Sequence, residues 1–531
     1  MMKMKNFLYV AAAVLLFAAC SKDFGEDNDL TGEKKWVSFK IALPSGSSGT
    51  RSVDGLAAGA EYAGTNDEKK ISSVRVVLYA SDQVAYAFDL TASTDGSAPI
   101  AGVDVSTAST ATATYFVSKG REVLSKSYKM AVLINPTAAM LSVTAETHAL
   151  AELETAAANI SATTFVTANG IMMSNSQGLV NVATTDLSVD AATAESSPVS
   201  VAVDRAVAKV FVNTPTAGIT VLNGASGDAV PAASITWALD ITNKKSFYIR
   251  KQALALTGNG TTTAPAPRAA ETIGTAAALR YSRYGEDPNW TGFAALAAGH
   301  ATLLGEFNYY TSTTATFNSL GWNDADGRYV LENTMNEVDQ YEVETTRVLV
   351  KMNYVPKGIT AGSDWLSYKG YIFTKQALLD SFQVAIDSVI AYPLSPKEMA
   401  YLPAGFKADM RAIYVANGGS VASGATYNPA ILSGLLTAAF EVNNLRFYLG
   451  GMSYYNVLIR HFDETQQPMK MQYGRYGVVR NNVYKVELLS VRGPGTPVVV
   501  PPDGPDDKDT GFLSAEVSVL PWIVRVQGVN L

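Results

Sequence analysis

Apolar and polar residues alternate along residues 36–43, which is typical of a strand with one face in a protein core. The apolar face carries Val37, Phe39, Ile41 and Leu43. The Gly/Ser-rich segment that follows, residues 44–52, ends in a lone arginine, Arg51, followed by Ser52. Exposed loops of this composition are preferred sites of proteolytic cleavage. The pattern therefore predicts a half-buried strand followed by a cleavable loop.

Similar short patterns recur along the chain and predict a mostly β protein. Strands are expected over residues 71–80, 84–90, 128–134, 199–212, 234–241, 347–354, 371–373, 446–448, 454–461 and 482–490. Helices are expected over residues 140–158, 378–389 and 396–401. Many short strands with few long helices favour β-sandwich domains. We place a boundary before the loop at 257–270, which divides the chain into an N-terminal sandwich, residues 52–250, and a C-terminal sandwich, residues 251–490.

The C-terminal end combines a linker and an apolar strand. Residues 491–511 are rich in Pro and predict an extended linker. In residues 512–531 one face carries Leu513, Ala515, Val517 and Val519; Pro521 interrupts the pattern and Trp522 resumes it. A free apolar strand is an aggregation hazard, so it must be paired. It either folds back on its own domain or inserts into a neighbouring molecule, and the second alternative makes it a donor strand.

The N-terminal residues predict export and lipidation. Lys3 and Lys5 precede an apolar run, residues 7–19, which is too short to span a bilayer but fits a signal peptide. The run ends in two alanines before Cys20, as in a bacterial lipoprotein box. We expect residues 1–19 to be removed and Cys20 to be acylated, which makes residues 20–51 a lipidated propeptide anchored in a membrane. The alternative is an ordinary signal peptide with a chance cysteine.

Composition excludes several classes of function. The net charge is −7 without a basic cluster, which argues against nucleic-acid binding. The chain has one cysteine and three histidines, His148, His300 and His461, at spacings that match no metal or catalytic motif. Residues 323–327 are interpreted as an Asp-Gly turn rather than a calcium loop, and His461 with Asp463 and Glu464 as a strand end rather than a catalytic dyad. We therefore expect no enzyme activity, cofactor or metal.

Several short segments, taken in order, resemble one family. They are the lipoprotein box at Cys20, the strand at 36–43 before Arg51, and residues 171–174, 203–210, 331–334, 479–484 and 514–522. Together they resemble the major fimbrillins of Bacteroidetes type V pili, in particular the major subunits of the short fimbriae. The resemblance spans nearly the whole chain.

This resemblance implies a structural role. It implies two transthyretin-like β-sandwich domains, no enzyme activity, and export as a lipoprotein to the outer membrane. It also implies cleavage after an arginine by a trypsin-like protease, and Arg51 matches that position. Polymerisation by strand exchange into an extracellular fimbrium would follow. The implied partners are identical subunits and accessory tip and anchor pilins, and the fimbrium would support adhesion and biofilm formation.

The backbone and apolar surface that such strands expose are compatible with assembly by strand exchange. The strand at 36–43 can fill a groove in the first domain, and cleavage between Arg51 and Ser52 would release it. A neighbour's residues 512–531 would then satisfy the exposed apolar surface and backbone by strand addition. Two alternatives stay open at this point: a monomeric surface lipoprotein that binds glycan or host protein, and a tip or anchor adhesin of the same pilus class.

Overall fold

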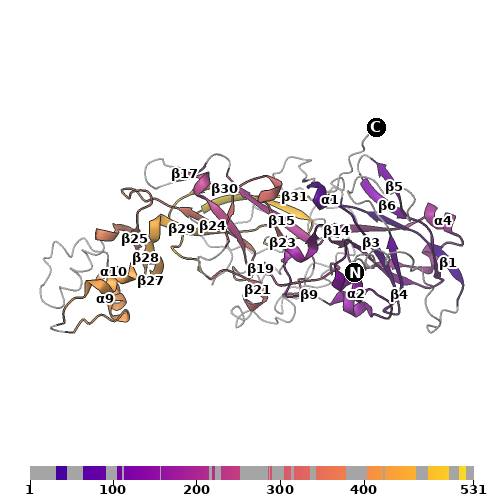
Figure 1. Cartoon of the computed structure of the whole chain (residues 1–531), viewed down its shortest axis with the longest axis horizontal. Coiled ribbons are helices and arrows are strands. Elements are labelled where there is room, and N and C mark those ends of the chain that lie inside the picture. The colour runs from indigo at the N-terminus through magenta and orange to yellow at the C-terminus, as the bar shows by residue number, and fades with distance from the viewer. Residues whose placement is uncertain are drawn as a thin grey trace, which may run out of the picture.

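The structure is a computed structural model of the whole chain. It describes residues 32–44, 62, 64–90, 105–110, 113–155, 157–214, 218–221, 229–251, 285, 287–289, 304–311, 316–334, 342–377, 404–422, 425–461, 476–500 and 513–521. The molecule is elongated and mostly β, with an N-terminal body, a central body and a small distal body in a row (Figure 1). The predicted fold class is confirmed.

The N-terminal body consists of short strands with a few helical turns. Its strands are β1 (Lys34–Val37), β2 (Phe39–Ala42), β3 (Val74–Ala80), β4 (Gln83–Leu90), β5 (Val105–Thr110), β6 (Ala113–Ser118), β7 (Arg121–Leu124), β8 (Tyr128–Ile134), β9 (Ala157–Ala158), β10 (Val166–Thr167), β11 (Gly170–Ile171), β12 (Met173–Asn175), β13 (Val180–Val182) and β14 (Val199–Arg205). Its helices are α1 (Asn66–Lys69), α2 (Ala138–Val143), α3 (Leu150–Glu154) and α4 (Ala191–Ser196), with 3-10 turns η1 (Ala162–Phe165) and η2 (Thr184–Asp186).

One strand, β14, belongs to both layers of this body. The strand order is β4-β3-β8-β12-β14-β2-β6-β5. The second half of β14 pairs with β12, whereas its first half pairs with β2. The two layers enclose one apolar core that includes Phe39, Val76 and Val132. As a result, β2 is an internal strand although it lies near the start of the chain.

The central body begins directly after β14. Its strands are β15 (Val207–Asn213), β16 (Gly218–Val221), β17 (Ala229–Pro231), β18 (Thr236–Asp240), β19 (Thr242–Asn243), β20 (Lys245–Ser246), β21 (Phe307–Asn308), β22 (Asn318–Ser319), β23 (Arg328–Leu331), β24 (Arg347–Asn353), β29 (Met452–Leu458), β30 (Asn482–Val491) and β31 (Leu513–Pro521). Its 3-10 turns are η3 (Ala232–Ser234), η6 (Leu304–Glu306), η7 (Asp324–Asp326) and η9 (Leu449–Gly451). One sheet has the order β17-β16-β30-β15-β23 with β31 on the free side of β30, and the facing sheet has the order β22-β18-β24-β29.

The distal body lies between β24 and β29 in the sequence. It contains a sheet of order β26-β25-β28-β27 formed by β25 (Trp365–Tyr368), β26 (Tyr371–Thr374), β27 (Phe440–Val442) and β28 (Leu445–Tyr448). Helices α9 (Phe406–Ala416) and α10 (Pro429–Leu435) share a core with this sheet. The helices predicted over 378–389 and 396–401 lie outside the described residues.

Three expectations from the sequence differ from the structure. The helix predicted over 140–158 is interrupted, because α2 ends at Val143 and the Thr144 hydroxyl donates back to the Met140 carbonyl (2.7 Å). The strand predicted over 199–212 is divided at Ala206, where the chain passes from one body to the next. Because β15 pairs with β23 and β30, the sheets change at Ala206 rather than at the expected boundary near residue 250.

The expected linker is partly attached to the central body. The Tyr455 and Tyr448 hydroxyls donate to the carbonyls of Gly493 (3.0 Å) and Gly495 (2.8 Å), and Val499 is buried. Residues 491–500 are therefore not a free arm, as the composition had suggested, because one tyrosine of the central body and one of the distal body bind two of their carbonyls. Only residues 501–512 of the expected linker lie outside the described part of the chain.

Candidate assembly groove

The strand β2 fills a channel between β14 and β6, which we call the β2 groove. It runs parallel to β14, with Phe39 opposite Val199, and antiparallel to β6, with Ile41 opposite Phe116. The preceding strand β1 pairs antiparallel with β7, with Val37 opposite Arg121. Both edges of β2 are thus hydrogen bonded, so its removal would leave two strands with unpaired backbone groups.

A serine marks the point at which the strand changes partners. The Ser38 hydroxyl donates to the Ser118 carbonyl (2.7 Å), and the Ser118 hydroxyl accepts from the Phe39 amide (2.9 Å). The Ser38 carbonyl accepts from the Val199 amide (2.8 Å). Residues 38–39 face residues 118–120, which join β6 to β7. This bulge separates the β1–β7 ladder from the β2–β6 ladder.

The apolar face of this strand lies in the core of the N-terminal body. Val37, Phe39, Ile41 and Leu43 are each at most 3% exposed. The Phe39 ring lies 6.0 Å from the ring of Phe88, measured between centroids. On the other face, the Lys40 ammonium lies 4.2 Å from the Tyr115 ring centroid. Each buried apolar side chain contributes about 1.5–3 kcal/mol, so an empty β2 groove would be strongly unfavourable in water.

The chain leaves the groove at Leu43 and is next described at Tyr62. Residues 45–61, with Arg51 and Ser52, lie outside the described residues, as does Cys20. The Tyr62 hydroxyl accepts from the Lys209 ammonium (3.0 Å) and bonds to the Asp324 carboxylate. Tyr62 therefore fastens the chain to the central body downstream of Arg51, independently of β2.

The expected donor strand is paired within its own chain. Strand β31 runs antiparallel to β30, with Pro521 opposite Asn482 and Val517 opposite Val486 (Figure 1). Leu513 and Ala515 are half-buried against the core of the central body. The backbone of Val519 lies in this ladder, and Trp522 lies outside the described residues. β31 is an edge strand, since only β30 pairs with it among the described strands.

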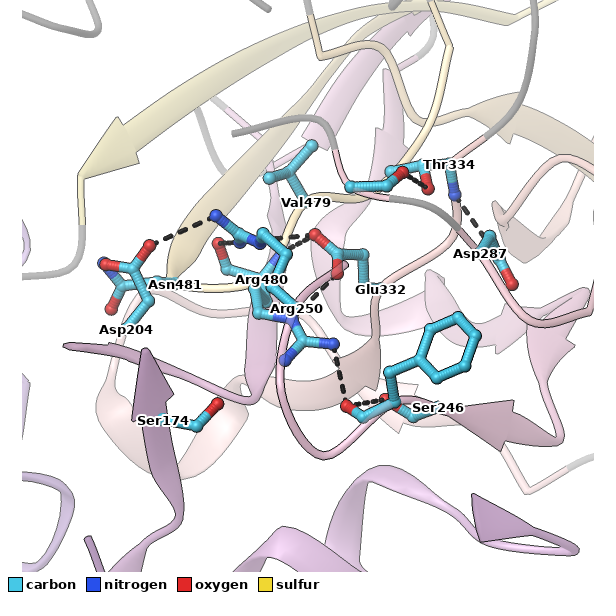
Figure 2. A network of polar contacts seen from close by, with 12 residues as sticks. Ser174, Asp204, Ser246, Arg250, Asp287, Glu332, Thr334, Val479, Arg480 and Asn481 are labelled. Atoms are coloured by element: carbon cyan, nitrogen blue, oxygen red, sulfur yellow. Dashed lines mark hydrogen bonds and ion pairs between the residues drawn. The ribbon is translucent and has the colours of Figure 1, made fainter. Parts of the chain in front are cut away.

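Buried charges join the N-terminal and central bodies at their junction. Arg250 contacts Asp204 (3.2 Å) and Glu332 (3.3 Å), and Arg480 pairs with Glu332 (2.8 Å). Figure 2 shows Asp204 and Asn481 on one side of this network and Glu332 on the other, and the Asn481 amide donates to Asp204 at 3.0 Å. Each charged side chain here is at most 4% exposed. The four segments at 171–174, 203–210, 331–334 and 479–484, which carried the family resemblance, all contribute to this junction or its core.

Burial shifts the pKa of groups at this junction. Desolvation lowers the pKa of Arg205 to about 10, and it also lowers the pKa of Arg480. It raises the pKa of the Asp287 carboxyl to about 7, although Asn289, Asn243 and Thr334 donate hydrogen bonds to that carboxylate. These residues were missed as a group at the level of sequence. The available signal was the occurrence of Asp204, Arg205 and Lys209 within apolar strands.

The remaining candidate residues have local structural partners. His148 is partly exposed and contacts Glu152 (2.8 Å), while buried His461 contacts the Tyr484 hydroxyl (2.7 Å). Residues 323–327 include the 3-10 turn η7, in which the Asp326 carboxylate accepts from the Asn323 amide (3.0 Å). Within the described ranges there is no cluster of three or more potential metal ligands. No helix in the same ranges is both long and apolar enough to cross a membrane.

Models of known protein families match two separate parts of the chain. A model described as "Major fimbrial subunit protein (FimA)" matches residues 38–209, and one described as "Major fimbrial subunit protein type IV, Fimbrillin, C-terminal" matches residues 446–528. No curated protein matches the chain. The first match begins at Ser38, directly before β2, and the second includes both β30 and β31.

Solved structures with low sequence identity also align over most of the chain. A fimbrilin from Porphyromonas gingivalis is 16% identical, with 92% of this chain and 99% of that chain covered and a TM-score of 0.38. A putative cell adhesion protein from Parabacteroides distasonis is 14% identical, with coverages of 93% and 100% and a TM-score of 0.39. A C-terminally truncated tip fimbrial protein from P. gingivalis is 10% identical, with coverages of 92% and 100% and a TM-score of 0.31.

Both family matches are to structural subunits of fimbriae. Two parts of the chain, residues 38–209 and 446–528, are therefore similar to major fimbrial subunits.

Proposed function

We propose that this chain is the shaft subunit of a fimbrium and that it polymerises by donor-strand exchange. It is exported as a lipoprotein acylated at Cys20 and held at the outer membrane. A trypsin-like protease cleaves it between Arg51 and Ser52, and β1–β2 then leaves the groove with the lipidated propeptide. A neighbour's C-terminal strand takes its place, and the fimbrium supports adhesion and biofilm formation. Identical subunits form the shaft, with accessory tip and anchor pilins at its ends.

The observation that carries this proposal is the position of β2. It is an internal strand with a buried apolar face, yet one stretch of chain, residues 45–61, joins it to the rest of the subunit. A single cut at Arg51 would convert β1–β2 into a peptide held without a covalent bond. The fastening of Tyr62 to Lys209 would keep the new N-terminus on the subunit.

The C-terminal strand is suited to leave its present position. Among the described strands β31 pairs only with β30, and residues 501–512 could extend up to roughly 40 Å. When β31 leaves β30, it loses the backbone hydrogen bonds to one neighbouring strand. When it fills an emptied β2 groove, it gains backbone hydrogen bonds to two strands, β14 and β6. Donation from one subunit to the next is heterologous and does not close, so it builds a filament.

The test compares cut and uncut protein by electron microscopy. Purified protein cleaved by a trypsin-like protease should form filaments, whereas uncleaved protein should stay monomeric. Protein truncated after Val500 and then cleaved should remain folded without extending a filament. Filaments from uncleaved protein, or from the truncated protein, would contradict the proposal.

The pairing of β31 with β30 in the same chain favours a second candidate, a monomeric surface lipoprotein that binds glycan or host protein. In that case truncation after Val500 would lower the melting temperature of the cleaved monomer strongly, and the parent would form no filaments. Measuring both melting and filament yield for parent and truncated protein separates the two candidates. A tip or anchor adhesin would add to the end of a filament without forming one alone.

A further inference from the structure

The β2 groove has a defined shape that an incoming strand must match. Four inward positions hold Val37, Phe39, Ile41 and Leu43 in order, so the second is aromatic. Position 38 has a further property, because the Ser38 carbonyl accepts a hydrogen bond from Val199 while its amide donates none within the described part of the chain. The groove therefore accepts at position 38 a residue that has no N–H.

The C-terminal segment contains two apolar faces that cannot both point into the groove. The odd-numbered set is Leu513, Ala515, Val517 and Val519, and the even-numbered set is Leu520, Trp522, Val524 and Val526. Successive residues of a strand point to opposite sides, so one extended strand presents one set inward and the other outward. Before exchange, Leu513 and Ala515 of the odd-numbered set contact the core of their own central body.

We propose, building on strand exchange, that the even-numbered set fills the neighbour's groove. Residues 520–526 take the places of residues 37–43 in the same direction, which puts the Trp522 ring in the pocket of Phe39, beside Phe88. Leu520, Val524 and Val526 then replace Val37, Ile41 and Leu43. The odd-numbered set would instead place Ala515 or Val517 in the Phe39 pocket and leave the ring volume unfilled.

Proline 521 supports both the register and the direction. In this register Pro521 stands where Ser38 stands, at the position whose amide makes no hydrogen bond to any described residue. The opposite direction would place Pro521 at Ala42, between Ala202 and Tyr115 and inside both ladders. A proline is poorly tolerated within a central strand because it cannot donate to a ladder.

The direction of the donated strand also determines at which end of the N-terminal body it enters the groove. β14 runs toward the junction, because Asp204 near its end contacts Arg250. A strand parallel to β14 therefore begins near β1, at the end of the N-terminal body away from the junction (Figure 1). The neighbour's linker should approach that end of the molecule.

Engineered cysteines test the register in a chain that has none left after cleavage. Cys20 is the sole cysteine and is removed with residues 1–51. Exposed Ala202 is the β14 partner of Ala42, so the proposed register places Arg525 beside it, whereas the odd-numbered register places Ser518 there. We compare Ala202→Cys/Arg525→Cys with Ala202→Cys/Ser518→Cys, using Ala202→Cys alone as the control. Assembled, oxidised protein is run on a non-reducing gel.

The proposal expects a ladder of cross-linked subunits from the Arg525 pair and none from the Ser518 pair. A ladder from the Ser518 pair, or filaments with a ladder from neither pair, would overturn the register while leaving strand exchange in place. Failure of the cleaved parent to form filaments would overturn strand exchange itself, and the register with it.

A second measurement uses side-chain volume. Trp522→Ala should reduce filament yield at least tenfold without changing the melting temperature of the uncleaved monomer, and Trp522→Phe should restore most of the yield. Val517→Ala is the matched control on the other face and should assemble nearly as the parent does. A greater loss from Val517→Ala than from Trp522→Ala would contradict the proposal.

Discussion

Glu68 and Lys209 form an ion pair of 2.6 Å at the junction, and each side chain is only 2% exposed. Glu68 lies in α1 of the N-terminal body, and Lys209 lies in β15 of the central body. The Tyr329 hydroxyl also donates to Glu68 (2.7 Å), and the Lys209 ammonium lies 5.0 Å from the centroid of the Phe211 ring. The pair thus links the two bodies at their junction.

Breaking this pair should destabilise the subunit. Glu68→Gln leaves the Lys209 ammonium buried without its charge partner, for which we expect a loss of about 3–5 kcal/mol in the free energy of unfolding by urea. The exposed pair of Lys34 and Glu122, also at 2.6 Å, gives the control. Glu122→Gln should change stability by less than about 1 kcal/mol. Equal effects of the two substitutions would show that burial does not determine how much the Glu68–Lys209 pair contributes to stability.

The junction should also make stability depend on pH. Burial raises the pKa of Asp287 to about 7, above the value of about 3.9 for an unfolded chain. The folded state therefore retains a proton that the unfolded state has lost, so stability falls as pH rises from about 4 to 7 and is level above that range. Between pH 5 and 8 the expected decrease is on the order of 3 kcal/mol. Urea unfolding of Asp287→Asn should lack this decrease, and an unchanged pH dependence in that variant would contradict the assignment.

Preventing cleavage should keep the subunit monomeric. With Arg51→Ala, β1–β2 should stay in its groove, because the four buried apolar side chains and both ladders remain joined to the chain. Size-exclusion chromatography and negative-stain microscopy after protease treatment would measure this. Arg75→Ala is an unsuitable control because Arg75 pairs with Asp89, so Lys126→Ala serves as the substitution elsewhere on the surface. Filaments of normal number from Arg51→Ala would refute the maturation step, unless sequencing showed a cut at Lys35 or Lys40.

Lipidation should depend on one residue. Cys20→Ser should abolish acylation, since a thiol is required to take the diacylglycerol and Cys20 is the sole cysteine. Metabolic labelling with a palmitate analogue, followed by membrane fractionation, measures it. Ser21→Ala should label as the parent does. Undiminished labelling of Cys20→Ser would show that the N-terminal residues are not a lipoprotein box.

Local pattern was sufficient to identify the strand at 36–43 and its inward face. The period-two alternation at 36–43 predicted which side chains point inward, and Val37, Phe39, Ile41 and Leu43 all lie in the core. Alternation suffices there because a strand with one apolar face is stable only when that face is buried. The same reasoning failed for residues 140–158, where the Thr144 hydroxyl bonds to the backbone and the helix ends. Helical periodicity does not reveal such a competing hydrogen bond.

The partners of those strands were decided by tertiary structure alone. The sequence at 36–43 does not say that β2 lies between β14 and β6, because those strands come from residues far along the chain. Likewise Asp204 contacts Arg250 and Asn481, the latter 277 residues away in sequence. For residues 513–521 the sequence left fold-back and donation open, and the fold pairs them with β30. A strand's own residues determine that it needs a partner, while the choice of partner depends on the free energies of the competing ladders in the folded molecule and in the filament.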